Sequence, residues 1–143
     1  MLRSDVERKT LFDKDEHDKL PVAAYSPAVT ARVYATIADK ARRALAAGHS
    51  AVIDAVFAKP QERAVAAASA EILGVSFHGL FLAADLATRV ARVSGRGRDA
   101  SDADAAVARR QETYDLGTFD WRRIDASGTP EETFARARAA TGQ

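Results

Sequence analysis

The sequence predicts an α/β fold in three layers, with a mostly parallel sheet and flanking helices. Two observations predict it. Helix signals and short apolar runs alternate along the chain, which is typical of parallel sheets. The apolar runs are continuous rather than interrupted at every second residue, as in strands buried on both faces. The length of 143 residues suits one domain, so we expect residues 1–143 to form a single one.

Composition and charge exclude several classes of protein. The chain has no cysteine, which excludes a disulfide framework, thiolate zinc sites, iron–sulfur clusters and a cysteine nucleophile. Its 21 basic and 20 acidic residues give a net charge of +1, so no global field attracts nucleic acid or an anionic membrane. We expect a soluble cytoplasmic protein, because the N-terminus becomes polar within five residues and no run approaches the ~18 apolar residues of a membrane span.

The first third of the chain predicts a short extended entry and two helices. Met1–Ser4 is expected to be extended, and Asp5 can cap the helix that follows it. Asp13–Lys19 is a charge-dense loop. The clearest helix begins at Ser26-Pro27, since serine is a good N-cap and proline suits the first helical position. Apolar residues then recur every fourth position until Gly48.

The middle of the chain predicts two strands and a helix between them. Ala51–Phe57 is an apolar run with one aspartate, and we interpret it as a buried strand. An alanine-rich helix follows over Pro60–Leu73 and ends at Gly74. Val75–Leu82 is the second predicted strand.

The last third predicts three helices, a loop and a strand. Acidic or hydroxyl caps precede each helix, and the strand alternates in polarity. In order these elements are a helix over Leu86–Val93 capped by Asp85, a loop over Ser94–Ala100, a helix from Ser101–Asp104 to Thr113, a strand over Phe119–Asp125 and a helix from Thr129-Pro130.

Several common catalytic motifs are absent from the sequence. No glycine precedes a lysine, so there is no G-x-x-x-x-G-K-[ST] phosphate loop. Gly95-Arg-Gly97 follows a predicted helix rather than a strand, unlike a dinucleotide-binding turn. No G-x-S-x-G elbow is present. The three histidines are too far apart in sequence for a metal-binding motif: His17, His49 and His78.

Two aspartates fall at strand ends, where open α/β sheets bind ligands. Asp5 follows the first extended segment, and Asp54 lies near the end of Ala51–Phe57. A carboxylate in either place can act as a general base or hold a hydrated Mg²⁺. The structural alternatives are a helix cap for Asp5 and a hydrogen-bonded edge residue for Asp54.

Arginines accompany these acids near the same rim of the sheet. Arg8 is three positions beyond Asp5, so both project from one helical face, either as a local ion pair or as an acid beside a phosphate-binding guanidinium. Arg63 is one turn into the helix after the strand. A further cluster is either a solvated basic face or a lid that closes over phosphates; it consists of Arg89, Arg92, Arg96 and Arg98.

Together, these segments resemble a known family, the P-loop kinase group that includes polynucleotide kinase, chloramphenicol phosphotransferase and zeta toxin. Leu2-Arg-Ser-Asp5-x-x-Arg8-Lys9 is similar to the group's second-strand segment. Val52-Ile-Asp54-Ala-x-Phe-x-x-Pro60-x-x-Arg63 is similar to its third strand and the helix after it. Arg89-x-x-Arg92-x-x-x-Arg96 resembles its lid.

The resemblance is strongest to the ATP-binding half of bacterial bifunctional aminoglycoside phosphotransferase/ATP-binding proteins. It spans nearly the whole chain, and the order and spacing of its short motifs make it more specific than any one motif. Three stretches carry it: Thr30–Thr36, Ala46–Phe57 and Asp99–Val107.

The resemblance implies a role for each candidate residue. Asp5 would be the base for the acceptor hydroxyl, and Arg92 and Arg96 would stabilise the transferring phosphoryl group. Acceptor binding would fall to Arg8 and Arg63, and nucleotide binding to Arg89 and Arg98. Asp54 would hold Mg²⁺ weakly, through water. ATP and Mg²⁺ are thus implied as cofactors by the resemblance alone, and the alternative is that this chain binds neither.

The chain departs from the family at its beginning. The family's first strand, phosphate loop and helix, a unit of roughly 30 residues, precede the segment that here starts at Met1. We therefore expect weak or absent phosphotransferase activity, because the loop supplies the amides and lysine that hold the nucleotide phosphates. Loss of a central strand also leaves unpaired sheet edges, which would either close up or pair with a second copy as a homodimer or swapped oligomer.

Three functional interpretations remain open from the sequence. The first is a degenerate or truncated P-loop-kinase-like domain that keeps acceptor-side and lid residues. The second is an active small-molecule or nucleotide kinase whose upstream segment is missing from this chain. The third is a non-enzymatic oligomeric interaction module on the same scaffold. The arginines favour a phosphate-bearing small molecule as ligand, and the sequence leaves the acceptor unspecified.

Overall fold

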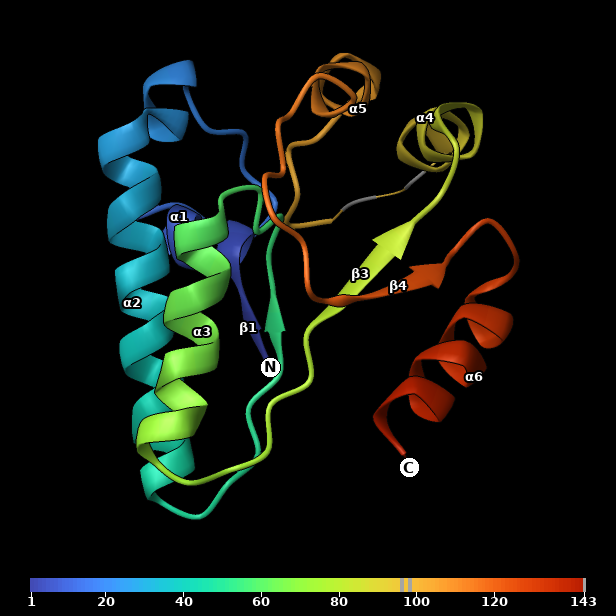
Figure 1. Ribbon diagram of the computed structural model, residues 1–143. Coiled ribbons are helices and arrows are strands. Elements are labelled where there is room, and N and C mark those ends of the chain that lie inside the picture. The colour runs from blue at the N-terminus through green and yellow to red at the C-terminus, as the bar shows by residue number, and fades with distance from the viewer. Residues whose placement is uncertain (96, 98, 143) are drawn as a thin grey trace. The chain divides into compact units, whose positions relative to one another are not determined.

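The computed structural model describes residues 1–95, 97 and 99–142, which form a mixed α/β fold with short parallel strands (Figure 1). The chain divides into two compact units. The first unit comprises Met1–Ser76 together with Gly97–Asp102, and the second comprises Phe77–Arg96 together with Ala103–Gln143.

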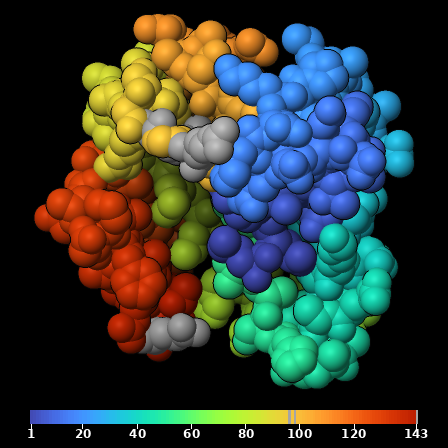
Figure 2. Space-filling model, turned by 180° about the vertical axis from the view of Figure 1, so that it is seen from behind, coloured from blue at the N-terminus to red at the C-terminus, as the bar shows by residue number. Residues whose placement is uncertain are grey.

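Within the part that the structure describes, the first unit forms two strands, three α-helices and a 3-10 turn. Its elements are β1 (Leu2–Arg3), α1 (Ser4–Leu11), η1 (Val22–Tyr25), α2 (Pro27–Ala46), β2 (Ile53–Asp54) and α3 (Pro60–Ile72). The predicted start of the long helix is confirmed, because the Ser26 side chain accepts a hydrogen bond from the Val29 N–H at 3.4 Å and Pro27 occupies the first turn of α2. Residues 13–19 are exposed, and the blue N-terminal part of the chain forms part of the molecular surface in Figure 2.

Strands β1 and β2 pair in parallel, and their register sets the geometry of the site. Leu2 lies opposite Ile53 and Arg3 opposite Asp54, and the Leu2 N–H donates to the Val52 carbonyl at 2.8 Å. Both strands therefore end at the same edge, where α1 begins directly after β1. This edge brings the start of α1 close to Asp54.

Strand β2 is shorter than the predicted Ala51–Phe57, for a local reason. Phe57 has a positive φ of 48°, a conformation that carries the chain out of a strand. Its N–H donates to the Tyr34 hydroxyl of α2 at 2.8 Å, and the two rings stack edge-to-face. The Tyr34 side chain of α2 thus takes the place of a further strand-to-strand hydrogen bond at Phe57.

The core of the first unit lies mainly on one face of α2. Val33 and Ile37 are fully or almost fully buried, and each contributes about 1.5–3 kcal/mol by leaving water. The other core positions are mostly small, which lets α2 pack closely against α1 and α3; they are Ala24, Ala38, Ala41, Ala70 and Ala100, with Phe57 as the large exception.

The described residues of the second unit form two strands and three helices. Its elements are β3 (Leu80–Ala83), α4 (Leu86–Gly95), α5 (Ala105–Gln111), β4 (Arg122–Asp125) and α6 (Pro130–Thr141). Strands β3 and β4 are parallel, with Leu80 opposite Arg122. The predicted start of the last helix is confirmed, since Thr129 and Glu132 cap α6 reciprocally.

The described strands form two two-stranded parallel sheets, one in each unit. The predicted parallel pairing is confirmed, although the strands do not join into one sheet within the described residues. Strand β3 begins later than the predicted Val75–Leu82, after Gly79, which lies directly against the Trp121 indole. None of the helices in the described residues is long and apolar enough to cross a bilayer.

Candidate functional site

Asp5 occupies the first turn of α1, immediately after β1. Its side chain is partly buried, and this burial raises the pKa of the carboxyl above its usual value. A hydrogen bond from the Ser101 side chain and the positive charge of Arg8 oppose the rise without cancelling it. The carboxyl therefore holds a proton more readily than a free aspartate, in the direction that suits a general base.

Arg8 lies on the same helix and points into the protein. It is 6% exposed, and its Nη1 donates to the Ala24 carbonyl at 2.7 Å and to the Thr30 hydroxyl at 3.3 Å. The guanidinium lies over the Tyr25 ring at 4.9 Å. Its Nε is buried without a hydrogen-bond partner among the described residues, which is uncommon in folded proteins. Arg8 thus holds η1 in place and keeps one unsatisfied donor.

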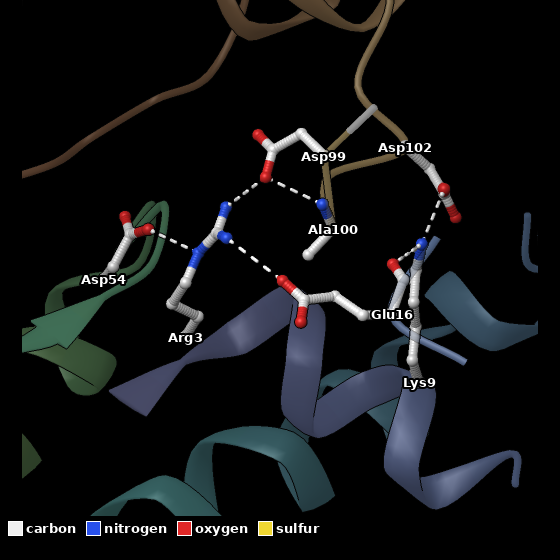
Figure 3. A network of polar contacts seen from close by, with 7 residues as sticks. All are labelled: Arg3, Lys9, Glu16, Asp54, Asp99, Ala100 and Asp102. Atoms are coloured by element: carbon white, nitrogen blue, oxygen red, sulfur yellow. Dashed lines mark hydrogen bonds and ion pairs between the residues drawn. The ribbon is translucent and has the colours of Figure 1, made fainter. Parts of the chain in front are cut away.

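Asp54, at the end of β2, pairs with Arg3. The Arg3 Nε donates to Asp54 Oδ2 at 3.3 Å, and the Asp54 side chain is well exposed. Arg3 also donates to Asp99 at 2.8 Å and lies 3.6 Å from the Glu16 carboxylate (Figure 3). The hydrogen bond to Asp99 raises the pKa of Arg3 most strongly, against the lowering effect of burial. Arg3 therefore joins β2, the loop after α1 and the segment after α4.

Lys9 and Asp102 form a further ion pair beside those of Arg3 (Figure 3). Lys9 is 1% exposed, and its Nζ donates to the Glu16 carbonyl at 2.8 Å and to Asp102 at 3.1 Å. Asp102 also accepts from the Leu20 N–H and the Tyr25 hydroxyl. Burial alone would raise the pKa of Asp102, but the hydrogen bonds together lower it.

Sequence reasoning missed this network. Arg3 and Lys9 stand within the motif that predicted Asp5, yet their partners Asp99 and Asp102 are more than 90 positions away. The only signal in the sequence was a set of three closely spaced aspartates after the predicted lid, whose first two members are these partners. Such spacing is ordinary in a helix-capping segment, so it did not distinguish a docked segment from a cap.

Arg63 lies in the first turn of α3 and is 3% exposed. Its Nη1 donates to the carbonyls of Phe57 and Ala58, at 2.8 and 3.2 Å. In this conformation Arg63 fixes the turn that leads from β2 to α3. Its predicted role in acceptor binding stays a prediction.

The predicted lid arginines belong to the second unit or lie outside the described residues. Arg89 donates to the Ala108 carbonyl at 3.5 Å and pairs with Glu112, while its Nε is buried without a partner among the described residues. Arg92 donates to the Gly128 carbonyl. Arg96 and Arg98 lie outside the described residues. The structure thus brings together Asp5, Arg8 and Asp54 in the first unit and describes Arg89 and Arg92 within the second.

The described residues do not by themselves fit a complete nucleotide and Mg²⁺ site. No group of three or more histidine, aspartate or glutamate side chains is arranged for a metal ion in the part of the chain that is described. Asp54 alone could hold a hydrated ion, but Arg3 engages its Oδ2. The sequence also contains no phosphate loop. The partly buried acid Asp5 and the unsatisfied donor of Arg8 fit the acceptor side of a phosphate-handling site instead.

Most of the chain matches a known protein family. A family model described as an AAA domain matches residues 1–114, which include Asp5, Arg8, Asp54 and the segment after α4. The chain belongs to this AAA domain family. Domains of this family are P-loop NTPase-like and include kinase-like members, so membership implies nucleotide binding in general terms.

Curated relatives of this AAA domain include uncharacterized proteins of Mycobacterium bovis and of two strains of Mycobacterium tuberculosis. Each is 35% identical over 117 residues, covering 79% of this chain and 23% of the relative. The chain thus spans less than a quarter of the length of these relatives. No solved structure gives a significant match.

Proposed function

We propose that this AAA domain is the acceptor-side part of a P-loop-kinase-like phosphotransferase. One observation carries the proposal. Asp5, partly buried with a raised pKa, stands at the carboxyl end of a parallel strand pair, one helical turn from a buried arginine. Open α/β sheets bind their ligands at this edge.

Asp5 acts as the base in this proposal. It accepts the proton of the acceptor hydroxyl as the hydroxyl oxygen attacks the transferring phosphorus. Its burial shifts the pKa of the carboxyl upward, toward the pH at which the protein works, which is the direction that improves general-base catalysis. Asp54 adds negative charge that raises the same pKa further.

Arg8 binds the acceptor or its phosphate in this proposal. Its unsatisfied Nε costs about 1–3 kcal/mol as a buried donor, and a phosphate oxygen would satisfy it. The donor is covered in this conformation, so binding requires η1 to move. Val22 and Tyr25 of η1 are 90% and 42% accessible, whereas Ala24 is fully buried, so this shift of η1 would also disturb the packing of Ala24 in the core.

The nucleotide side of the reaction requires groups beyond those of the first unit. ATP with Mg²⁺ would supply the phosphoryl group, and Arg92 and Arg96 would stabilise it, with Arg89 and Arg98 on the nucleotide phosphates. Because the sequence contains no phosphate loop, we infer that this chain alone transfers phosphate slowly or not at all.

Substitution of the proposed base tests this function. Mg²⁺–ATP turnover is measured with a panel of phosphorylated sugars and nucleosides as acceptors, for the wild type, Asp5→Asn and the exposed control Asp39→Asn. Removing a general base costs about 10²–10⁴-fold, so Asp5→Asn should abolish any acceptor-dependent turnover while Asp39→Asn retains it. Acceptor-dependent turnover that persists at the full rate in Asp5→Asn contradicts the assignment.

A second candidate function, an interaction module that self-associates, is favoured by the strand edges. Within the described residues, β2 pairs only with β1 and β3 only with β4. Val52 beside β2 and Leu82 in β3 are 62% and 57% exposed. Unpaired edges with exposed apolar side chains recruit further strands. Light scattering across a concentration series tests this candidate: a dimer supports it, and a monomer at high concentration argues against it.

A further inference from the structure

The four residues Asp99–Asp102, here called the strap, dock on the first unit. In sequence the strap lies between α4 and α5, whose residues belong to the second unit, yet the strap itself is assigned to the first. Ala100, in its middle, is fully buried. The strap is therefore a packed part of the first unit rather than a loose connection.

Three strap side chains contact three residues at the start of the chain. Asp99 accepts from Arg3 at 2.8 Å and also from the Ala100 N–H. Ser101 hydrogen-bonds to the Asp5 carboxyl. Asp102 pairs with the buried Lys9. These contacts fall on β1 and α1, on residues before and after the proposed base in the sequence, and Figure 3 shows those of Asp99 with Arg3 and of Asp102 with Lys9.

The contact between Ser101 and Asp5 bears directly on the base. A hydroxyl that donates to one carboxylate oxygen fixes the rotation of the carboxyl group and leaves the other oxygen to accept a proton. It also stabilises the charged form that burial disfavours. Ser101 thus acts on the orientation and on the charge of Asp5 together.

Asp102 acts on the other half of the proposed site. Its carboxylate accepts from the Leu20 N–H at 3.1 Å and from the Tyr25 hydroxyl at 2.6 Å. These groups bracket the segment whose Ala24 carbonyl holds Arg8. One strap carboxylate therefore fixes the cover over Arg8, while the preceding serine fixes Asp5.

We propose that the strap is the positioning element of the acceptor site, with Ser101 orienting Asp5 and Asp102 holding the Leu20–Tyr25 segment over Arg8. This proposal rests on the proposed function, since it assigns a role at the same site.

Carbon-13 NMR of the Asp5 carboxyl tests the role of Ser101. The pH midpoint of Asp5 is compared in the wild type, Ser101→Ala, the conservative variant Ser101→Thr and the exposed control Ser50→Ala. We expect Ser101→Ala to raise the midpoint, because a donor to the carboxylate is lost. Ser101→Thr should restore the wild-type midpoint and Ser50→Ala should leave it unchanged. An unchanged midpoint in Ser101→Ala overturns the proposal, whatever happens to thermal stability.

Hydrogen exchange tests the role of Asp102. Tyr25→Phe removes one of its bonds without removing a charge, so the variant should fold even if Asp102→Asn does not. We expect exchange at the Ala24 amide to rise by about tenfold in Tyr25→Phe, while the amides of α3 keep their rates. Unchanged exchange at Ala24 overturns this part of the proposal.

The two proposals can fail separately. The pH midpoint of Asp5 and the exchange rate of the Ala24 amide are both measured without substrate. Both results therefore remain valid if Asp5→Asn leaves phosphoryl transfer unchanged, an outcome that would reject the proposed function. Conversely, the turnover assay can identify Asp5 as the base while Ser101→Ala leaves the pH midpoint of the Asp5 carboxyl unchanged. That result would reject the strap proposal alone.

Discussion

Replacing Asp102 with asparagine probes the interaction that anchors the strap. Lys9 is 1% exposed and has Asp102 as its ion-pair partner at 3.1 Å. Asparagine keeps one acceptor oxygen but removes the charge, which leaves a buried ammonium group without its counter-charge. Removing one partner of a buried pair costs about 3–5 kcal/mol. We take the low end, about 3 kcal/mol, because the Asp102 side chain is 16% exposed and the asparagine oxygen can still accept one bond.

Urea unfolding followed by circular dichroism measures this loss as a change in the free energy of unfolding. Asp39→Asn is the matched control, since Asp39 pairs with Arg42 at 3.5 Å on the exposed face of α2, and such pairs contribute at most about 1 kcal/mol. The pKa of Asp102 is lowered in the folded protein, so its contribution is present above the unfolded value of 3.8 and is lost as pH falls through the folded value. The difference between wild type and Asp102→Asn should therefore shrink below pH 4. Equal stability of Asp102→Asn and Asp39→Asn at pH 7 would refute the reasoning.

Two further substitutions test the packing around the site. The pKa of Asp5 is raised by burial, so the contribution of this carboxyl to folding stability is complete below the unfolded pKa of 3.8 and is lost as pH rises through the folded pKa. Asp5→Asn should therefore melt at a higher temperature than wild type at pH 7 and at the same temperature at pH 3. A lower melting temperature of the variant at pH 7 would show that the charged carboxyl stabilises the fold. Tyr34→Phe removes the hydroxyl that accepts a hydrogen bond from the Phe57 N–H, and should lower the free energy of unfolding in urea by about 1–3 kcal/mol. The control is Tyr114→Phe, because Tyr114 is 38% exposed. An equal loss of unfolding free energy in the two variants would show that the hydrogen bond does not stabilise the turn at Phe57.

Local signals in the sequence predicted much of the fold. Ser26-Pro27 and Thr129-Pro130 place the helix starts correctly, because an N-cap side chain and a proline act within three residues. The strand ends were less predictable. Residues 51–57 are apolar enough for a longer strand, but the Phe57 N–H bonds to the Tyr34 hydroxyl instead of to a neighbouring strand. A local sequence pattern cannot indicate this partner, because Tyr34 is 23 positions away.

The candidate site was predictable in its residues but not in its contacts. Asp5 and Asp54 follow from their places at strand ends and Arg8 from its spacing to Asp5, and the register of β1 with β2 brings the strand ends to one edge. The burial of Arg8 against Ala24 and Tyr25 depends on where η1 folds back. The strap contacts depend on closure over more than 90 residues, which periodicity and capping rules do not encode.

The most direct test of the central claim observes the side chain of Arg8 while phosphate is added. The arginine Nε–H resonances of the protein are followed by nitrogen-15 NMR during a titration with inorganic phosphate, in the wild type, in Arg8→Lys and in the exposed control Arg32→Lys. If the acceptor site is as proposed, the Arg8 Nε–H resonance shifts and saturates, Arg32→Lys titrates as the wild type does, and Arg8→Lys loses the saturable binding. An Arg8 resonance that stays in place while only exposed arginines shift in proportion to phosphate would contradict the account.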